Sequence, residues 1–156
     1  MIVGVRLDHR MIHGQVAVAW CHQLSVTRII LIDDDVAKDD FQKQVLKMAR
    51  PAGTVANIFS VEEALRKMPT IETLTDNIFI VFASVDNLYR FVKSYPKLQS
   101  VIYGGTKKEE GKTEYSSVVY LTEEEAKQTK EIVDMGIKIY MQQLPSTEKE
   151  EFIFKN

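Results

Sequence analysis

The sequence contains one cysteine, Cys21, in 156 residues. A lone cysteine cannot form an intrachain disulfide, and it excludes both an all-cysteine zinc site and an iron–sulfur cluster held by several cysteines. Scarce cysteine is typical of proteins that fold in a reducing compartment, so we expect a cytoplasmic protein.

The sequence also lacks an excess of positive charge and any long apolar run. Its 20 Lys and Arg against 22 Asp and Glu give a net charge of -2, which favours no nucleic-acid partner. No apolar run approaches the roughly 18 residues of a membrane span. The first ten residues, MIVGVRLDHR, carry charge where a signal peptide has its apolar stretch, so we expect neither a span nor a signal.

Short apolar runs alternate along the chain with longer segments of helical periodicity. The predicted strands cover residues 2–7, 28–32, 55–59, 77–82, 100–103, 118–121 and 137–141. Strands separated by helices are typical of right-handed crossovers and a parallel sheet. The sequence therefore predicts a single α/β domain over residues 1–156, with a mainly parallel central β-sheet and helices on both faces.

The helical segments show recognisable ends. The pattern predicts helices over residues 14–24 and 85–94, a short helix after Ser60, and a helix from Thr122 to Gly136. After the acidic run 33–35 we expect one amphipathic segment with an apolar stripe of Val36, Phe41, Val45, Leu46 and Met48. The apolar part of the tail, residues 152–154, is expected to dock on the body or on a partner.

All three histidines, His9, His13 and His22, fall in a window of 14 residues. Two of them lie in the loop after the first predicted strand, which reads RLDHRMIHGQV from Arg6 to Val16. Ligands of parallel sheets bind at the carboxyl ends of the strands, so we expect this loop to form the active site.

One hypothesis for this loop is a phosphoryl-carrying histidine, His13. A phosphohistidine is dianionic and needs matching donors: Arg6 and Arg10 offer guanidinium groups, and the backbone N–H groups at Gly14 and Gln15 begin the predicted helix. Asp8 is predicted to bond one ring nitrogen and leave the other free to attack. The alternatives are a loop with incidental histidines and an Asp8–Arg10 surface pair, or a metal site.

The metal hypothesis would pair His9 with His13 as H-x-x-x-H. That spacing needs a helix to aim both rings at one ion, whereas a loop is predicted here, and no Glu follows His9. We expect no metal and no cofactor. Cys21 lies in the apolar face of the first predicted helix, which disfavours it as a nucleophile, and His22 is expected to be a plain helix residue.

Two further loops are expected at the same edge of the sheet. Ser84 follows a predicted strand and either reaches the phosphoryl group or simply caps the next helix, and Lys107 is either a phosphate-binding charge or part of a solvated turn. Residues 105–113, GTKKEEGKT, nearly match a nucleotide-binding phosphate loop, but they have one residue too many, two glutamates, and no helical pattern afterwards.

The segment RLDHRMIHGQV resembles the active-site loop of the IIB component of the mannose/sorbose family of the bacterial sugar phosphotransferase system, R-[IVL]-D-x-R-[LM]-I-H-G-Q-V. The resemblance extends to VFAS at residues 81–84, to the GGT-x-x-x-x-GK loop at 104–112, and in effect to the whole chain.

The resemblance implies that His13 accepts a phosphoryl group from a phosphohistidine of a separate IIA protein. It then passes the group to a sugar that enters through the membrane components IIC and IID. Arg6, Asp8 and Arg10 are implied to bind the phosphoryl group or orient His13, and Gly14 and Gln15 to form the phosphate-facing turn, while no role carries over to His9.

The implied location is the inner face of the cell membrane, reached through IIC and IID. A regulatory phosphorelay protein and a non-catalytic domain that binds phosphorylated metabolites remain alternatives. The nitrogen of His13, the sugar (mannose, fructose, sorbose or an amino sugar) and the oligomeric state, including a homo-oligomer, stay open.

Overall fold

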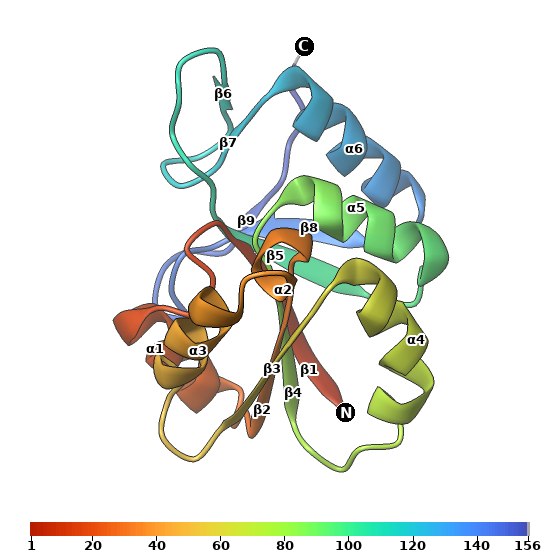
Figure 1. Ribbon diagram of the computed structural model, residues 1–156. Helices are drawn as coiled ribbons and strands as arrows, with labels where there is room; N and C mark the ends of the chain where they lie inside the picture. The colour runs from red at the N-terminus through yellow and green to blue at the C-terminus, as the bar shows by residue number, and fades with distance from the viewer. Residues whose placement is uncertain (156) are drawn as a thin grey trace.

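The structure, a computed structural model, describes residues 1–155 and has a seven-stranded sheet at its centre (Figure 1). The strands of this sheet are β1 Ile2–Asp8, β2 Arg28–Ile32, β3 Val55–Phe59, β4 Ile78–Phe82, β5 Ser100–Gly105, β8 Lys138–Met141 and β9 Glu150–Glu151. They lie in the order β3-β2-β4-β1-β5-β8-β9. Six of them are parallel and β9 is antiparallel, which agrees with the predicted mainly parallel sheet.

Strand β1 lies in the middle of the sheet, between β4 and β5. The chain moves to one side of β1 for β2, β3 and β4, and then crosses to the other side for β5 and β8. Because the strands are parallel, the loops that leave β1, β4 and β5 emerge at the same edge. This change of direction is where ligands of open α/β sheets bind.

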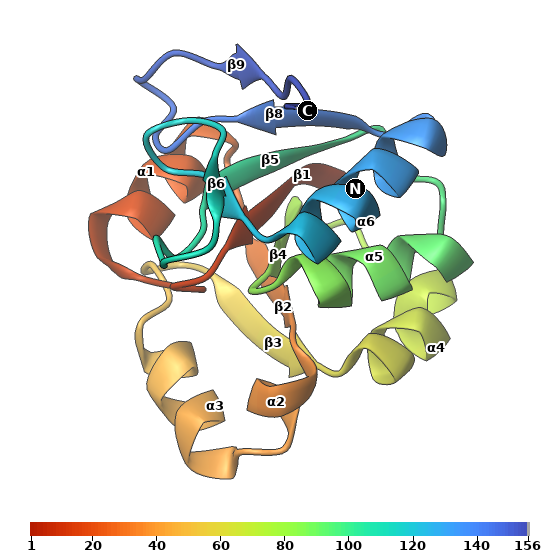
Figure 2. The same cartoon turned by 90° about the horizontal axis from the view of Figure 1, so that it is seen from above.

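Helices cover both faces of the sheet, as Figures 1 and 2 show. On one face lie α1 Gly14–Gln23 and α3 Asp40–Met48, with the short α2 Asp34–Ala37 before α3. On the other face lie α4 Val61–Ile71, α5 Val85–Ser94 and α6 Glu123–Asp134. The longest of these helices has 12 residues, and no helix within residues 1–155 is long and apolar enough to cross a membrane.

Each central strand is buried on both sides, which explains why these strands read as continuous apolar runs. In β2, Ile30 and Ile32 pack in the core under α4, α5 and α6. Ile29 and Leu31 point to the opposite face and pack with Trp20 of α1. The two hydrophobic cores therefore share the sheet as their common wall.

The prediction of one amphipathic segment after residue 33 is wrong in one respect, because this part of the chain forms two helices, α2 and α3. Asp39 accepts a hydrogen bond from the backbone N–H of Gln42 and so begins α3 as a second N-cap. The stripe of Phe41, Val45 and Met48 is exposed, with 80% of Phe41 and 80% of Met48 accessible, because α3 directs Leu46 and not this stripe into the core.

The predicted strand over 118–121 and the tail also differ from expectation. Only β7 Tyr120–Leu121 is extended there, and it pairs with β6 Thr113–Glu114 in a separate hairpin outside the central sheet. In the tail, Phe152 is buried and docks as expected, while the neighbouring Ile153 is 72% exposed.

Candidate functional site

A buried carboxylate, Asp8, lies at the end of β1 and organises the loop that follows. Its side chain is 0% exposed. The backbone N–H of Arg10 donates to Oδ1 at 2.9 Å. The N–H of Met11 donates to the carbonyl of Asp8 at 2.9 Å, and Met11 has a positive φ of 67°. The chain therefore turns tightly around Asp8 before it reaches His13.

Arg6 is buried under the loop and holds Asp8 from below. One guanidinium nitrogen, Nη2, is 3.1 Å from Asp8 Oδ2. The guanidinium also donates to the carbonyls of Gln142 at 3.0 Å and Gln143 at 2.9 Å, beyond the end of β8. These contacts and its 3% exposure commit Arg6 to the protein interior, and Asp8 links it to His13.

Gly104 in β5 makes room for Arg6. A Cβ atom at Gly104 would lie 2.0 Å from Arg6 Cζ, which is a severe overlap. Trp20 covers the guanidinium from another side, with its ring centre 5.3 Å from Cζ. Arg6 therefore fills a slot that β5, α1 and the segment after β8 build together.

Arg10 approaches the same carboxylate from the solvent side. Its Nε is 3.2 Å from Asp8 Oδ1 and its Nη2 is 3.4 Å from Oδ2. The side chain is 39% exposed, so part of its guanidinium faces water. Arg10 is thus the arginine of this pair that can donate to a ligand at the surface.

His13 lies at the start of α1 with its Nε2 at 3.3 Å from Asp8 Oδ2. Its side chain is 26% exposed, and it makes no capping hydrogen bond to the helix that it precedes. The five other helices in residues 1–155 are capped by a side-chain oxygen, from Asp33, Asp39, Ser60, Ser84 and Thr122. The first N–H groups of α1, from Gly14 onward, are therefore left for an external acceptor beside His13.

The charge of Asp8 decides which nitrogen of a neutral His13 ring carries the proton. Burial disfavours the charged form of Asp8, but hydrogen bonds from Arg10 and the charges of Arg6 and Arg10 outweigh it, and the pKa of Asp8 is lowered. An ionised carboxylate only accepts hydrogen bonds. In a neutral His13 ring the proton therefore lies on Nε2, and Nδ1 carries the free lone pair. Burial lowers the pKa of Arg6, which still stays charged because the ordinary value is so high.

The remaining candidate residues have different surroundings. Gln15 is exposed on the first turn of α1. Ser84 accepts hydrogen bonds from the backbone and side chain of Asn87 at 3.1 and 2.8 Å, which is the capping role weighed from the sequence. The side chain of Lys107 is 69% exposed, and its Nζ lies 4.0 Å from Oε2 of Glu109. The backbone N–H of His9 donates to the Gly105 carbonyl at 3.0 Å, and the ring nitrogen Nδ1 of His9 lies 3.3 Å from the same oxygen.

The surroundings of Cys21 and the possible metal ligands were the remaining features that the sequence raised. Burial raises the pKa of the Cys21 thiol to about 11, which keeps it protonated and unreactive. No group of three or more His, Cys, Asp or Glu within residues 1–155 is arranged to hold a metal ion.

The sequence missed three contributors to this site: the carbonyls of Gln142 and Gln143, and the slot at Gly104. The two carbonyls lie more than 130 residues from Arg6 along the chain. No pattern in a single sequence marks a backbone carbonyl as a ligand, although the paired glycines at 104 and 105 do indicate close packing.

A buried Asp–Arg pair beside a partly exposed histidine at an uncapped helix start offers hydrogen-bond donors that suit an anion. The family model for the sorbose-subfamily IIB component of the phosphotransferase system (PTS) matches residues 2–154. The chain therefore belongs to the PTS sorbose-subfamily IIB family.

Curated relatives and solved structures agree with this assignment. The chain is 31% identical over 139 residues to the sorbose-specific EIIB component of Lacticaseibacillus casei, covering 89% of this chain and 85% of the relative. It is 29% identical to the mannose-specific EIIAB component of Escherichia coli K12 and spans 46% of that longer protein, which is about half its length.

Among solved structures, manxB from Thermoanaerobacter tengcongensis is similar, with a TM-score of 0.89 and 30% identity over 97% of this chain and 92% of that one. The N-acetylgalactosamine-specific IIB component 1 of Escherichia coli gives a TM-score of 0.91 at 25% identity, covering 98% of this chain and 100% of that one.

Proposed function

We propose that this chain is the phosphocarrier of a sugar phosphotransferase system, with His13 as the phosphorylated residue. In this proposal a phosphohistidine on a IIA protein is the donor, and a sugar bound by membrane components IIC and IID is the acceptor. The observation that carries the proposal is the bond between Asp8 and Nε2 of His13, at the uncapped start of α1. The family membership and the names of the relatives support the same role.

The first step follows from the free lone pair of His13. Nδ1 attacks phosphorus, the new N–P bond forms, and the N–P bond of the donor breaks with its electron pair returning to the donor imidazole. The phosphorylated ring of His13 keeps its proton on Nε2 and carries positive charge, which Asp8 stabilises through its hydrogen bond. No general base is needed, because the attacking nitrogen bears no proton.

The phosphoryl oxygens gain negative charge that nearby donors offset. Arg10 supplies N–H groups from the solvent side, and Gly14, with a φ of +40°, opens α1 so that its N–H groups face the same space. Catalysis then depends on positioning and charge neutralisation.

In the second step a hydroxyl oxygen of the sugar attacks phosphorus and the N–P bond of His13 breaks. The ring returns to its neutral form with the proton on Nε2. The proton of the hydroxyl leaves to a base outside this chain. We place the protein in the cytoplasm, at the inner face of the membrane where IIC and IID bind it.

Phosphate labelling tests the proposal. The chain is incubated with phosphoenolpyruvate, Enzyme I, HPr and a IIA protein, and the acid-labile phosphate is mapped. We expect one phosphate on His13, with a nitrogen NMR shift that assigns it to Nδ1, and no label in His13→Ala. His22→Ala is the matched control, since His22 is exposed on the same helix and away from Asp8, and it should label normally.

Two outcomes contradict parts of the proposal. Normal labelling of His13→Ala would remove His13 as the acceptor. Labelled protein that fails to phosphorylate a sugar in membranes containing IIC and IID would favour the regulatory phosphorelay alternative over transport.

A further inference from the structure

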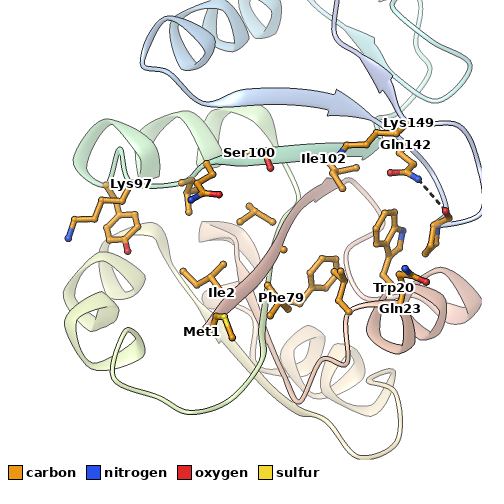
Figure 3. A pocket seen from close by; sticks show the side chains of 18 residues that line it. Met1, Ile2, Trp20, Gln23, Phe79, Lys97, Ser100, Ile102, Gln142 and Lys149 are labelled. Atoms are coloured by element: carbon orange, nitrogen blue, oxygen red, sulfur yellow. Dashed lines mark hydrogen bonds between the residues drawn. The ribbon is translucent and has the colours of Figure 1, made fainter.

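A groove of about 730 Å³ opens on the sheet face that carries α1, alongside β1 and β5 (Figure 3). Its walls come from α1, from residues 95–99 before β5, and from residues 142–149 after β8. No residue from 6 to 19 lines it, so it lies apart from the His13 loop, and Trp20 and Gln142 border both. Its volume falls in the range of about 300–1,000 Å³ typical of small-molecule sites.

The lining of the groove is positively charged in an acidic protein. The chain has 22 Asp and Glu, yet none of them lines the groove, whereas Lys97 and Lys149 do. Lys97 is held at the rim by Glu72 at 3.7 Å. The Nζ atom of Lys149 lies over the ring of Tyr140, 4.1 Å from the ring centre, and it makes no ion pair within residues 1–155. The groove therefore favours an anion, and Lys149 is the lining lysine whose charge no described carboxylate neutralises.

Neutral hydrogen-bonding groups complete the lining. The side chains of Gln23, Gln99 and Ser100 make no hydrogen bond to another described residue, so they are free to bind hydroxyl groups. Ile102 and Trp20 give an apolar wall between them. The groove therefore offers three kinds of contact. The amides and the hydroxyl can bind the hydroxyl groups of a sugar, the apolar wall can pack against the sugar ring, and the ammonium group can bind a phosphate.

We infer that this groove binds a small polyhydroxylated phosphate ester, of the sugar phosphate class. Lys149 binds the phosphate, and the side chains of Gln23, Gln99 and Ser100 bind the hydroxyl groups. The groove shares residues with the support of the His13 site. Trp20 contacts Arg6, and its Nε1 donates to the carbonyl of Gln143 at 2.9 Å.

Gln142 links the groove to Arg6 directly. Its carbonyl accepts from Arg6, and its side-chain amide donates to the carbonyl of Thr147 at 2.9 Å, which braces the turn after β8. A ligand that binds the Gln142 side-chain amide removes its hydrogen bond to Thr147 and so destabilises the turn whose carbonyls accept from Arg6. A shift of Arg6 would in turn change its contact with Asp8. Resting on the proposed function, we further expect the bound sugar phosphate to slow phosphorylation of His13, as feedback by the class of product that the reaction makes.

Binding to the full, unphosphorylated chain tests the site. Mannose 6-phosphate and fructose 6-phosphate are titrated by calorimetry and by NMR shifts of the Trp20 indole N–H and the free glutamine amides. We expect saturable binding that weakens about tenfold or more in Lys149→Glu. Binding should be unchanged in Lys130→Glu, an exposed lysine on α6 outside the groove.

Several results would overturn the inference. One is the lack of saturable binding up to about 10 mM ligand. Another is loss of binding in Arg10→Ala but not in Lys149→Glu, which would move the ligand to the His13 site. Equal affinity for inorganic phosphate would reduce the groove to an anion site without sugar recognition. Since binding is measured with neither IIA nor a phosphate donor, its failure is distinguishable from a failure of His13 labelling.

Feedback is measured separately as the rate of His13 labelling with and without the sugar phosphate. We expect the wild-type rate to fall several-fold at saturation and the rate of Lys149→Glu to stay at its ligand-free value. A wild-type rate that stays constant while the groove is occupied would overturn the feedback role.

Discussion

At the scale of single residues, Asp8 links every group that matters for His13. Its carboxylate accepts hydrogen bonds from the guanidinium of Arg6, from the backbone N–H of Arg10 and from the ring of His13. Buried carboxylates are stable only when such partners are present. The same contacts that stabilise the charge of Asp8 also leave Nδ1 of a neutral His13 ring with the free lone pair, which is the nitrogen that attacks in the proposed mechanism.

The first prediction concerns the charge of Asp8. Asp8→Asn replaces an acceptor-only group by an amide that can also donate, so the His13 ring is no longer held with its proton on Nε2. We expect the rate of His13 labelling to fall by at least about 10²-fold, as in other orienting Asp–His pairs. Asp40→Asn, at an exposed site on α3, should leave the rate unchanged. An unchanged rate in Asp8→Asn would contradict the orienting role.

The second prediction follows from the lowered pKa of Asp8 in the folded protein. A folded pKa below the unfolded value means that the unfolded chain binds more protons in this range, so stability rises with pH. The contribution of Asp8 is complete above the unfolded value of about 3.9 and is lost as pH falls through the lower folded value.

Urea unfolding at pH values from neutral to acidic measures this effect. The difference in free energy of unfolding between wild type and Asp8→Asn should be largest at neutral pH and shrink below about pH 4. A difference that grows on acidification would show that the folded pKa is raised instead.

At the scale of helices and strands, the site depends on how β1, β5 and α1 meet. Strand β1 delivers Arg6 and Asp8 on one side of the sheet, because residues two apart in a strand share a face. Strand β5 lies next to β1 and offers Gly104, without a side chain, where the Arg6 guanidinium crosses it. Helix α1 begins at Gly14, directly after the N-cap residue His13, so its N-terminus points at the same place.

The third prediction tests this slot. Gly104→Ala places a Cβ atom onto Arg6 Cζ and must displace the guanidinium from the Gln142 and Gln143 carbonyls. We expect a loss of about 1–3 kcal/mol in the free energy of unfolding, typical of an overpacked site, together with slower labelling of His13.

The neighbouring glycine provides a matched control. In Gly105→Ala the new Cβ would lie 3.3 Å from Nη2 of Arg10, a flexible and partly exposed group that can move. We therefore expect Gly105→Ala to lose less free energy of unfolding than Gly104→Ala. Equal losses in both variants would mean that the Arg6 slot has no special role.

At the scale of the whole molecule, the C-terminal segment closes the structure over distant parts of the chain. Phe152 packs against Tyr103 of β5 and stacks on Tyr115 before β7, with ring centres 6.1 and 4.6 Å apart. The backbone just before this segment supplies the two carbonyls for Arg6. Anchoring the tail therefore supports both the core and the site.

The fourth prediction compares two adjacent tail residues. Phe152→Ala removes a ring that is 7% exposed, and we expect it to cost about 3–5 kcal/mol in the free energy of unfolding. Ile153→Ala changes a side chain that is 72% exposed and should stay within about 0.5 kcal/mol of wild type. Chemical denaturation measures both, and a small loss in Phe152→Ala would contradict the anchoring role.

The α/β class, most strands and helices, and the loop that holds His13 could all be predicted from the amino-acid sequence. These features depend on local patterns: the periodicity of apolar residues, N-caps such as Ser84 and Thr122, and a specific motif around His13. The same local reasoning failed for the stripe of Phe41, Val45 and Met48, because an apolar stripe does not reveal whether a partner covers it.

The tertiary structure established the geometry of the candidate site. It directed Arg6 inward to Asp8 and to carbonyls more than 130 residues away, and left Arg10 facing water. It also paired Nε2 of His13 with Asp8 and built the groove from segments at both ends of the chain. The physical reason is that the contacts of Arg6 with the carbonyls of Gln142 and Gln143, and those that build the groove, join residues far apart in sequence, so they exist only after the sheet has brought the segments together. The contacts of Asp8 with Arg6 and His13 are local in sequence, but their geometry depends on the burial of Asp8 in the folded chain.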